Sequence, residues 1–385
     1  MMLLLTYLVT IFLLFGQLAW IDLGSGVRFY LIEPALILIV LAGIITTGWS
    51  PFVRLLKQRY ILLWFGWIIA GWAINGLSKG SAPSLQSGLY IIRLLAYLCA
   101  ATYIVAGKHT PRQALLLYFI PIICLLQYVL FPDLRFLQQY GWDPHMYRAV
   151  GLIFDPPVVG GVLGILWCNL LFRQNHVLFH NRKIYVFSAI SLFLSIIFLY
   201  SRSTYVALLI VTSIFLISKK RWILLVLFVG VTLVAITLAP LTIPSTMNLE
   251  SAKLDRSSTS ISRITEIREG IAAWLTSPII GIGYGRVAEY KSQLSQYRGI
   301  SADNHANSAF HSFWVTQLAT TGIVGCGLLV YLILKLIIWK KELVYPLIWV
   351  SIIGVFDNVV FHPLVLLTFI LVFTTKPPFV SNSEL

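Results

Sequence analysis

Long runs of apolar residues recur from one end of this sequence to the other, and they restrict the fold more than any other feature. Apolar residues make up 58% of the chain and charged residues only 11%, whereas soluble domains carry about 25% charged residues. A soluble fold could not bury so much apolar surface, while about 20 apolar residues suffice for a helix that crosses a membrane. The sequence therefore predicts an all-α, multi-pass membrane protein.

The apolar runs predict a bundle of about 12 membrane-spanning helices. The run at 309–338 is longer than one crossing requires, so its first turns are expected to project from the membrane or to tilt. The predicted spans are 3–20, 29–48, 60–76, 87–106, 114–131, 157–172, 184–200, 204–218, 222–239, 309–338, 343–357 and 363–375.

The formal net charge of +14 could indicate a nucleic-acid partner, but the positions of the basic residues argue against one. Basic residues cluster in alternate segments between the spans, which is the positive-inside pattern and predicts that both termini are cytoplasmic. The clusters are Arg54/Lys57/Arg59, Lys108/Arg112, Arg173/Arg182/Lys183, Lys219/Lys220/Arg221, Lys340/Lys341 and Lys376. The charge therefore reports topology.

The spans divide the chain into a bundle of nine spans at 1–239, a large outward-facing loop at 240–308, and three spans with a cytoplasmic tail at 309–385. Within the loop, apolar residues at three- or four-residue intervals from Ile261 to Ser277 predict an amphipathic helix that could lie on the membrane surface. Pro278 is expected to end it. Any chemistry should be sought in this loop.

No metal site or cofactor is expected. The four cysteines fall inside predicted spans, with no CxxC spacing and no neighbouring histidine cluster. They are Cys99, Cys124, Cys168 and Cys326.

Three arginines on the outward side could bind an anion. Arg202 lies in a tight turn between two apolar runs, where it either extends to the lipid headgroups or holds a phosphate. Arg263 and Arg268 lie on the amphipathic helix, interleaved with Glu266 and Glu269, so surface ion pairing explains them about as well as ligand binding does.

Two histidines and a glycine-rich stretch precede the tenth span. His305 and His311 flank a short segment there, and His311 is either a shielded titratable group or an interfacial histidine bonded to a carbonyl. The stretch 281–286, which ends in Arg286, lacks the strand and helix that a nucleotide-binding fingerprint requires. A close-packed turn explains it better.

Two further arginines are candidates for substrate binding. Arg148 leads into the sixth span from a loop rich in Tyr, Trp and Pro, which could be a sugar-binding lip or an ordinary interfacial aromatic belt. Arg93 lies within the fourth span. An intramembrane arginine marks a pathway or an anionic ligand, although a partner such as Glu33 would satisfy it structurally.

Three motifs occur in a fixed order across about 190–340. They are Ser201-Arg202 before an apolar span, Arg263 leading through Trp274 and Pro278 into 281–285, and the segment 311–314 followed by Gly322 and Gly325. Together they resemble the O-antigen polymerase and O-antigen ligase superfamily of bacterial polysaccharide enzymes, which are membrane glycosyltransferases of the C-type architecture. Ser312 departs from the family, which often has Asn at this position.

The resemblance implies that a glycan is transferred from an undecaprenyl-diphosphate carrier to an acceptor hydroxyl, on the outer face of the bacterial plasma membrane and without a nucleotide sugar or metal. Arg202 and Arg263 would then bind the diphosphate, and His311 would accept the hydroxyl proton. We expect Arg148, Arg268, Arg93, His305 and Arg286 to bind substrate.

We favour a polymerase, which joins lipid-linked repeat units, over a ligase, which moves the finished glycan to another acceptor. A transporter of lipid-linked sugars is a third alternative, although transport sites usually lie near the membrane midplane. The expected partners are the undecaprenyl-diphosphate-linked oligosaccharide, membrane lipids, a chain-length regulator and a flippase.

Overall fold

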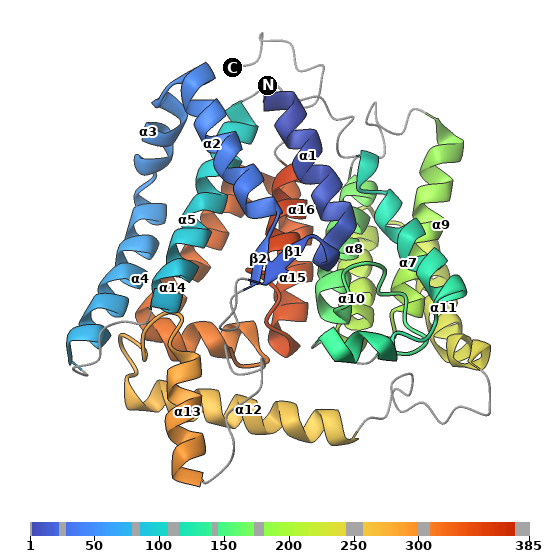
Figure 1. The fold of residues 1–385 in the computed structure, drawn as a ribbon. Coiled ribbons are helices and arrows are strands. Elements are labelled where there is room, and N and C mark those ends of the chain that lie inside the picture. Colours follow the sequence, from blue (N-terminus) through green and yellow to red (C-terminus); the bar gives the residue numbers. More distant parts are fainter. Residues whose placement is uncertain are drawn as a thin grey trace.

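The computed structural model describes residues 2–22, 28–78, 85–106, 115–140, 145–172, 181–243, 257–298 and 309–373. This part of the chain is helical apart from one small antiparallel sheet (Figure 1). The helices are α1 (Met2–Phe15), α2 (Ile32–Thr47), α3 (Ser50–Leu56), α4 (Arg59–Ser78), α5 (Leu85–Ala106), α7 (Phe119–Leu130), α8 (Pro156–Phe172), α9 (Arg182–Phe198), α10 (Arg202–Ser218), α11 (Trp222–Leu238), α12 (Ser257–Thr276), α13 (Val287–Arg298), α14 (Phe313–Trp339), α15 (Val344–Phe356) and α16 (Pro363–Phe373).

All twelve predicted spans coincide with helices, but length alone qualifies fewer of them as membrane crossings. Within the described residues, three helices are long and apolar enough to cross a membrane, namely Ser87–Ala106, Trp222–Thr242 and Phe313–Trp339. A fourth crossing results if α2 and α3 count as one span, although they meet at a bend of 110°. Several other apolar helices in the described part are shorter. The protein has the helices of a membrane bundle, and the number of crossings stays a prediction.

Strands β1 (Trp20–Asp22) and β2 (Arg28–Tyr30) pair antiparallel where the sequence predicted only the end of one span and the start of the next. Aromatic and β-branched residues supply much of both strands. These residues favour strands, whereas a hydropathy pattern counts them only as apolar. The hairpin is a short addition to a structure whose other described regular elements are helices, so the all-α class holds for the bundle.

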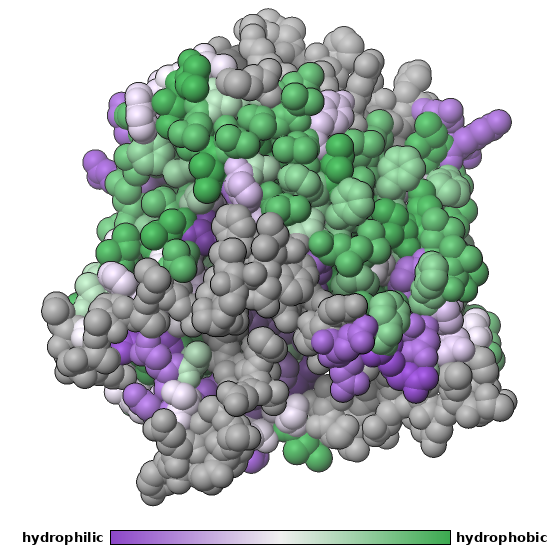
Figure 2. Space-filling view, viewed as in Figure 1, coloured by the Kyte–Doolittle hydropathy of each residue, from purple (hydrophilic) through white to green (hydrophobic). Residues whose placement is uncertain are grey.

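Apolar side chains cover the outside of the bundle. Figure 2 shows them over the visible face, while polar side chains gather near the end that carries α12 and α13. Ile45 and Ile223 are more than three-quarters exposed. An apolar surface of this extent suits contact with lipid.

Helices α8, α10 and α15 pack closely against one another. Their packing holds in place the ends of α10 and α15 that carry residues of the candidate site. Trp349 of α15 is fully buried and its indole N–H donates to the Gly160 carbonyl of α8 at 3.0 Å. A side chain on Gly164 would collide with that indole. Small residues thus allow the helices to approach, as they do in other membrane bundles.

Helix α12 lies across the end of the bundle, whereas most of the other helices run along it (Figure 1). Its buried residues Gly270 and Ala273 face the start of α14, where Val315 leaves no room for a side chain on Gly270. Ile264 and Ile271 stay exposed. The predicted amphipathic helix is confirmed, and it ends at Thr276, before Pro278.

Helix α14 breaks at Gly322, which has φ 67° and ψ −174°, a conformation open almost only to glycine. The break turns three carbonyls toward other partners. Ala319 accepts from the Ile282 N–H at 2.8 Å, Thr320 from the Gly283 N–H at 3.1 Å, and Thr321 from the Trp67 indole at 2.9 Å. The glycine-rich stretch 281–286 is thus a close-packed turn against α14, and the predicted tilt of this long helix is a kink.

Gly322→Ala is expected to destabilise the protein by about 3 kcal/mol or more, or to prevent folding. The new methyl group would meet the Ile279 carbonyl and require a strained φ. Gly327→Ala on the same helix is the control, because its methyl group meets no atom within 4 Å and alanine favours helix by up to about 1 kcal/mol. Thermal unfolding in detergent measures both. Equal midpoints for the two variants would contradict this account of the kink.

Candidate functional site

Asp357 contacts side chains from distant parts of the chain at the end of the bundle. It follows α15 in the short loop 357–362 and is 4% exposed. One carboxylate oxygen, Oδ1, pairs with Arg263 Nη2 of α12 at 2.8 Å. The other, Oδ2, accepts from the Ser203 hydroxyl of α10 at 3.0 Å. Asp357 therefore joins α12, from the segment 240–308, to the helices α10 and α15.

All three predicted catalytic residues lie near this carboxylate. Burial raises the pKa of the Asp357 carboxyl above its usual value, and the Arg263 charge is the main influence that opposes the rise. The charges of His311 and Arg202 act in the same direction as that of Arg263. A buried anion with positive charge on several sides is thus the centre of the candidate site.

Arg263 retains a donor for a ligand. Its side chain is 24% exposed, and its Nε–H is buried without a hydrogen-bond acceptor among the described residues. A buried donor that finds no acceptor is costly. An anion bound beside Arg263 would supply that acceptor.

Arg202 is the first residue of α10, where the helix dipole favours an anion. Tyr200, two residues earlier, has φ 52°, a conformation that costs energy for a residue with a side chain. Its hydroxyl donates to the Ala239 carbonyl at 2.8 Å, which holds the turn. The chain therefore reverses sharply in front of Arg202 and places it at the start of the helix.

His311 lies on a segment held by α12 and α13. Glu266 of α12 accepts the His311 backbone N–H at 2.9 Å, and its other oxygen lies 3.8 Å from His311 Nε2. Lys291 of α13 lies 3.4 Å from Glu266 and donates to the Ala309 carbonyl at 2.9 Å. Because the histidine side chain is 43% exposed, it stays open to a substrate.

Ser312 has a structural role at the position where the family often has Asn. It is the N-cap of α14, since its hydroxyl oxygen accepts from the Val315 N–H at 3.4 Å. The same hydroxyl donates to the Gly354 carbonyl of α15 at 3.2 Å. Both Ser and Asn are good N-caps, so this departure leaves the helix start intact.

Three other predicted substrate-binding residues lie on α12, on α5 and in the loop before α8. Arg268 is exposed, five residues beyond Arg263 and therefore about 140° around the helix. Arg93 forms an ion pair with Glu33, the partner that the sequence suggests as the structural alternative to ligand binding. Arg148 is buried, and the neighbouring Ala149 N–H donates to the carbonyl of Phe198 at the end of α9. His305 lies outside the described residues.

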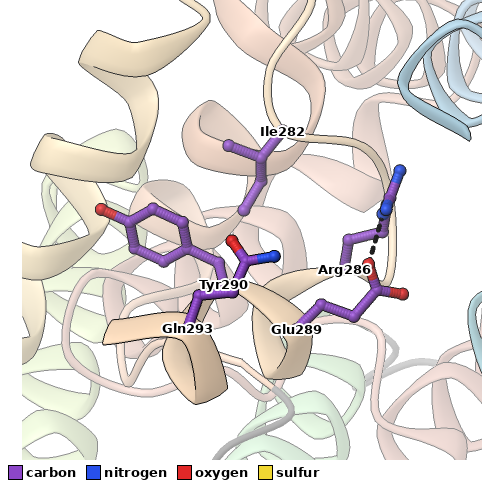
Figure 3. Close-up of a pocket in the computed structure, with 5 residues that line it drawn as sticks. All are labelled: Ile282, Arg286, Glu289, Tyr290 and Gln293. Carbon is purple, nitrogen blue, oxygen red and sulfur yellow. Dashed lines mark hydrogen bonds and ion pairs between the residues drawn. The ribbon is translucent and has the colours of Figure 1, made fainter. Parts of the chain in front are cut away.

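Arg286 borders a small, shallow hollow that is open to solvent. Figure 3 shows its side chain directed toward Glu289, with which it forms an ion pair of 2.7 Å, while Tyr290 and Gln293 line the hollow from α13 and Ile282 from the preceding turn. The pair ties the turn to the start of α13.

Sequence reasoning missed Asp357, Ser203 and the role of Glu266. In the sequence, Asp357 is one of many acidic residues predicted on the outward side. The one sign of its role is that it is the single acidic residue beside the short connection between the last two predicted spans. For Arg263, the sequence leaves open both ion pairing with the glutamates on the same helix and ligand binding. The structure instead pairs Arg263 with Asp357 and Glu266 with Lys291.

Comparison with known families identifies this region. A family model described as O-antigen ligase matches residues 187–330. This part of the chain is similar to that family. It includes Arg202, Arg263 and His311, whereas Asp357 follows the match, and the predicted resemblance to the O-antigen polymerase and ligase superfamily is confirmed. No curated protein matches the chain.

The region that resembles this family contains the groups needed to bind an anion and to move a proton. Arg202 and Arg263 can donate to phosphate oxygens, and guanidinium groups bind phosphate through paired hydrogen bonds. His311 is an exposed imidazole of the type that most often serves as a general base. Among the described residues, no three His, Cys, Asp or Glu side chains lie close enough to hold a metal ion.

Proposed function

We propose that the protein polymerises lipid-diphosphate-linked oligosaccharide repeat units into a surface polysaccharide, on the outer face of the bacterial inner membrane. The observation that carries the proposal is the position of the Asp357 carboxylate near Arg202, Arg263 and His311. These three residues belong to the segment that matches the O-antigen ligase family model. The family supports a glycosyltransferase-like enzyme. The undecaprenyl-diphosphate carrier, the metal independence and the polymerase activity belong to the proposal.

In this mechanism Arg202 and Arg263 bind the diphosphate of the donor, and Asp357 fixes the orientation of Arg263. The acceptor hydroxyl attacks the anomeric carbon of the donor sugar and loses its proton to His311. The new glycosidic C–O bond forms as the bond from the anomeric carbon to the phosphate oxygen breaks. The lipid diphosphate leaves with the bonding electron pair, and the arginines stabilise its charge.

A ligase is the second candidate, because the matching family model carries that description. Deletion of the gene and sizing of the surface glycan separate the two. Loss of a polymerase is expected to leave glycans that carry a single repeat unit, whereas loss of a ligase leaves long chains on the carrier. Long carrier-bound chains would overturn the polymerase assignment.

Purified protein with a lipid-diphosphate glycan in detergent tests for catalysis. An enzyme extends or transfers the glycan without any gradient, because the leaving diphosphate supplies the driving force. A transporter leaves the glycan unchanged. An unchanged glycan under conditions where the protein remains folded would contradict both enzyme assignments.

A further inference from the structure

A second polar cluster lies between α2 and α5. Arg93 of α5 pairs with Glu33 in the first turn of α2, and these side chains are 27% and 13% exposed. The guanidinium carbon of Arg93 lies 5.8 Å from the centre of the Tyr30 ring and 6.0 Å from that of the Tyr90 ring. The cluster thus combines a neutralised ion pair with two aromatic rings and is partly open.

Tyr97 adds a buried hydroxyl to this cluster. It lies one helical turn from Arg93 on α5, within electrostatic range of Glu33, Arg93 and Tyr30. The residue is 3% exposed, and its hydroxyl has no hydrogen-bond partner among the described residues. Buried hydroxyls nearly always have partners, so one without any points to a ligand.

His362 connects this cluster to the Asp357 site. Its ring centre lies 6.3 Å from that of Tyr30, and its Nδ1 accepts from the Leu364 N–H at 3.3 Å, which leaves the proton on Nε2. Desolvation and the nearby Arg93 charge lower the pKa of His362 to about 3, so the ring is neutral at pH 7. Asp357 and His362 are five residues apart, so their Cα atoms are separated by at most about 18 Å.

The chemistry of the cluster suits a sugar better than an anion. An anion would have to compete with Glu33 for Arg93, whereas a sugar hydroxyl can both donate to the carboxylate and accept from the guanidinium. Aromatic rings with a few placed polar groups are typical of small-molecule sites. The apolar face of a sugar ring can pack on Tyr30 or Tyr90.

We propose that the Glu33–Arg93 cluster binds the sugar of the acceptor glycan that carries the attacking hydroxyl. This inference rests on the proposed glycan transfer and assigns a binding site to its second substrate, the acceptor. The acceptor sugar lies in a neutral aromatic site, and the donor diphosphate lies between Arg202 and Arg263. The loop 357–362 forms part of both sites.

Tyr97→Phe tests the proposal because it removes only the buried hydroxyl. The acceptor probe is the repeat unit linked to a short alkyl chain in place of the lipid diphosphate, which can accept a glycan but cannot donate one. We expect KM for this acceptor to rise about three- to tenfold, the loss of one hydrogen bond. The donor KM should be unchanged, and thermal stability should be equal or higher.

Tyr103→Phe on the same helix is the matched control, because the Tyr103 hydroxyl donates to the Gly48 carbonyl at 3.3 Å within the protein. It should lower thermal stability and leave the acceptor KM unchanged. An unaltered acceptor KM in Tyr97→Phe, with active wild-type protein, would overturn the acceptor site alone. No transfer by wild-type protein would overturn the proposed function instead.

Discussion

His311→Ala is expected to reduce glycan transfer by about 10²- to 10⁴-fold while the protein still inserts into the membrane. This range is typical for the removal of a positioned general base. The histidine is suited to that task because its side chain is partly exposed beside the buried Asp357 carboxylate. The measurement is the initial rate of elongation by purified protein in detergent with saturating lipid-linked repeat unit.

Two additional measurements separate a base from a structural histidine. His311→Gln keeps a polar side chain of similar reach but cannot accept the proton, so it should be as inactive as the alanine variant. Added imidazole should restore part of the rate in His311→Ala, since a small base can enter the space left by the ring. Turnover of the glutamine variant at the wild-type rate would refute the assignment.

The helices of the bundle were predictable because each apolar run is long and is bounded by charged or polar residues. The span predicted at 222–239, for example, corresponds to α11, Trp222–Leu238. Helix α13 was not predicted. It is a polar helix with few apolar residues, and its place depends on the ion pair of Lys291 with Glu266 and on the packing of Val287, which is 1% exposed.

The catalytic candidates were predictable as residue types, but their common centre was not. Arg263 and Asp357 are 94 positions apart, and Ser203 and Asp357 are 154 apart. Separations of this size leave no periodic pattern in the sequence. Their meeting depends on the close packing of α8, α10 and α15 around Trp349, which brings the start of α10 beside the end of α15.

Local competition between partners also limits prediction from sequence. Glu266 is three residues from Arg263, a spacing at which opposite charges commonly pair on a helix. That pair is worth only about 0.2 to 0.5 kcal/mol, whereas leaving a buried carboxylate without its charged partner costs about 3 to 5 kcal/mol. The stronger tertiary contact therefore determines the direction of Arg263 and leaves Glu266 for Lys291 and His311.

Asp357→Asn is expected to lower kcat/KM for the lipid-linked donor by about 10²-fold. The amide keeps the size of the carboxylate and can still accept from Ser203, but it lacks the charge that holds Arg263. Displacement of a binding group by about 1 Å can cost this much in rate. Asp357→Ala should also destabilise the fold by about 3 to 5 kcal/mol, because it leaves the partly buried Arg263 charge without its partner.

Asp133→Asn provides the matched control. Asp133 also pairs with an arginine at 2.7 Å, but its side chain is 42% exposed and that of Arg135 is 59% exposed. An exposed pair contributes between about 0 and 1 kcal/mol, so stability and kcat/KM should both stay near wild type. If Asp357→Asn matched Asp133→Asn in kcat/KM, the carboxylate would be a structural anchor for α12, and the orientation of Arg263 toward a diphosphate would need another source.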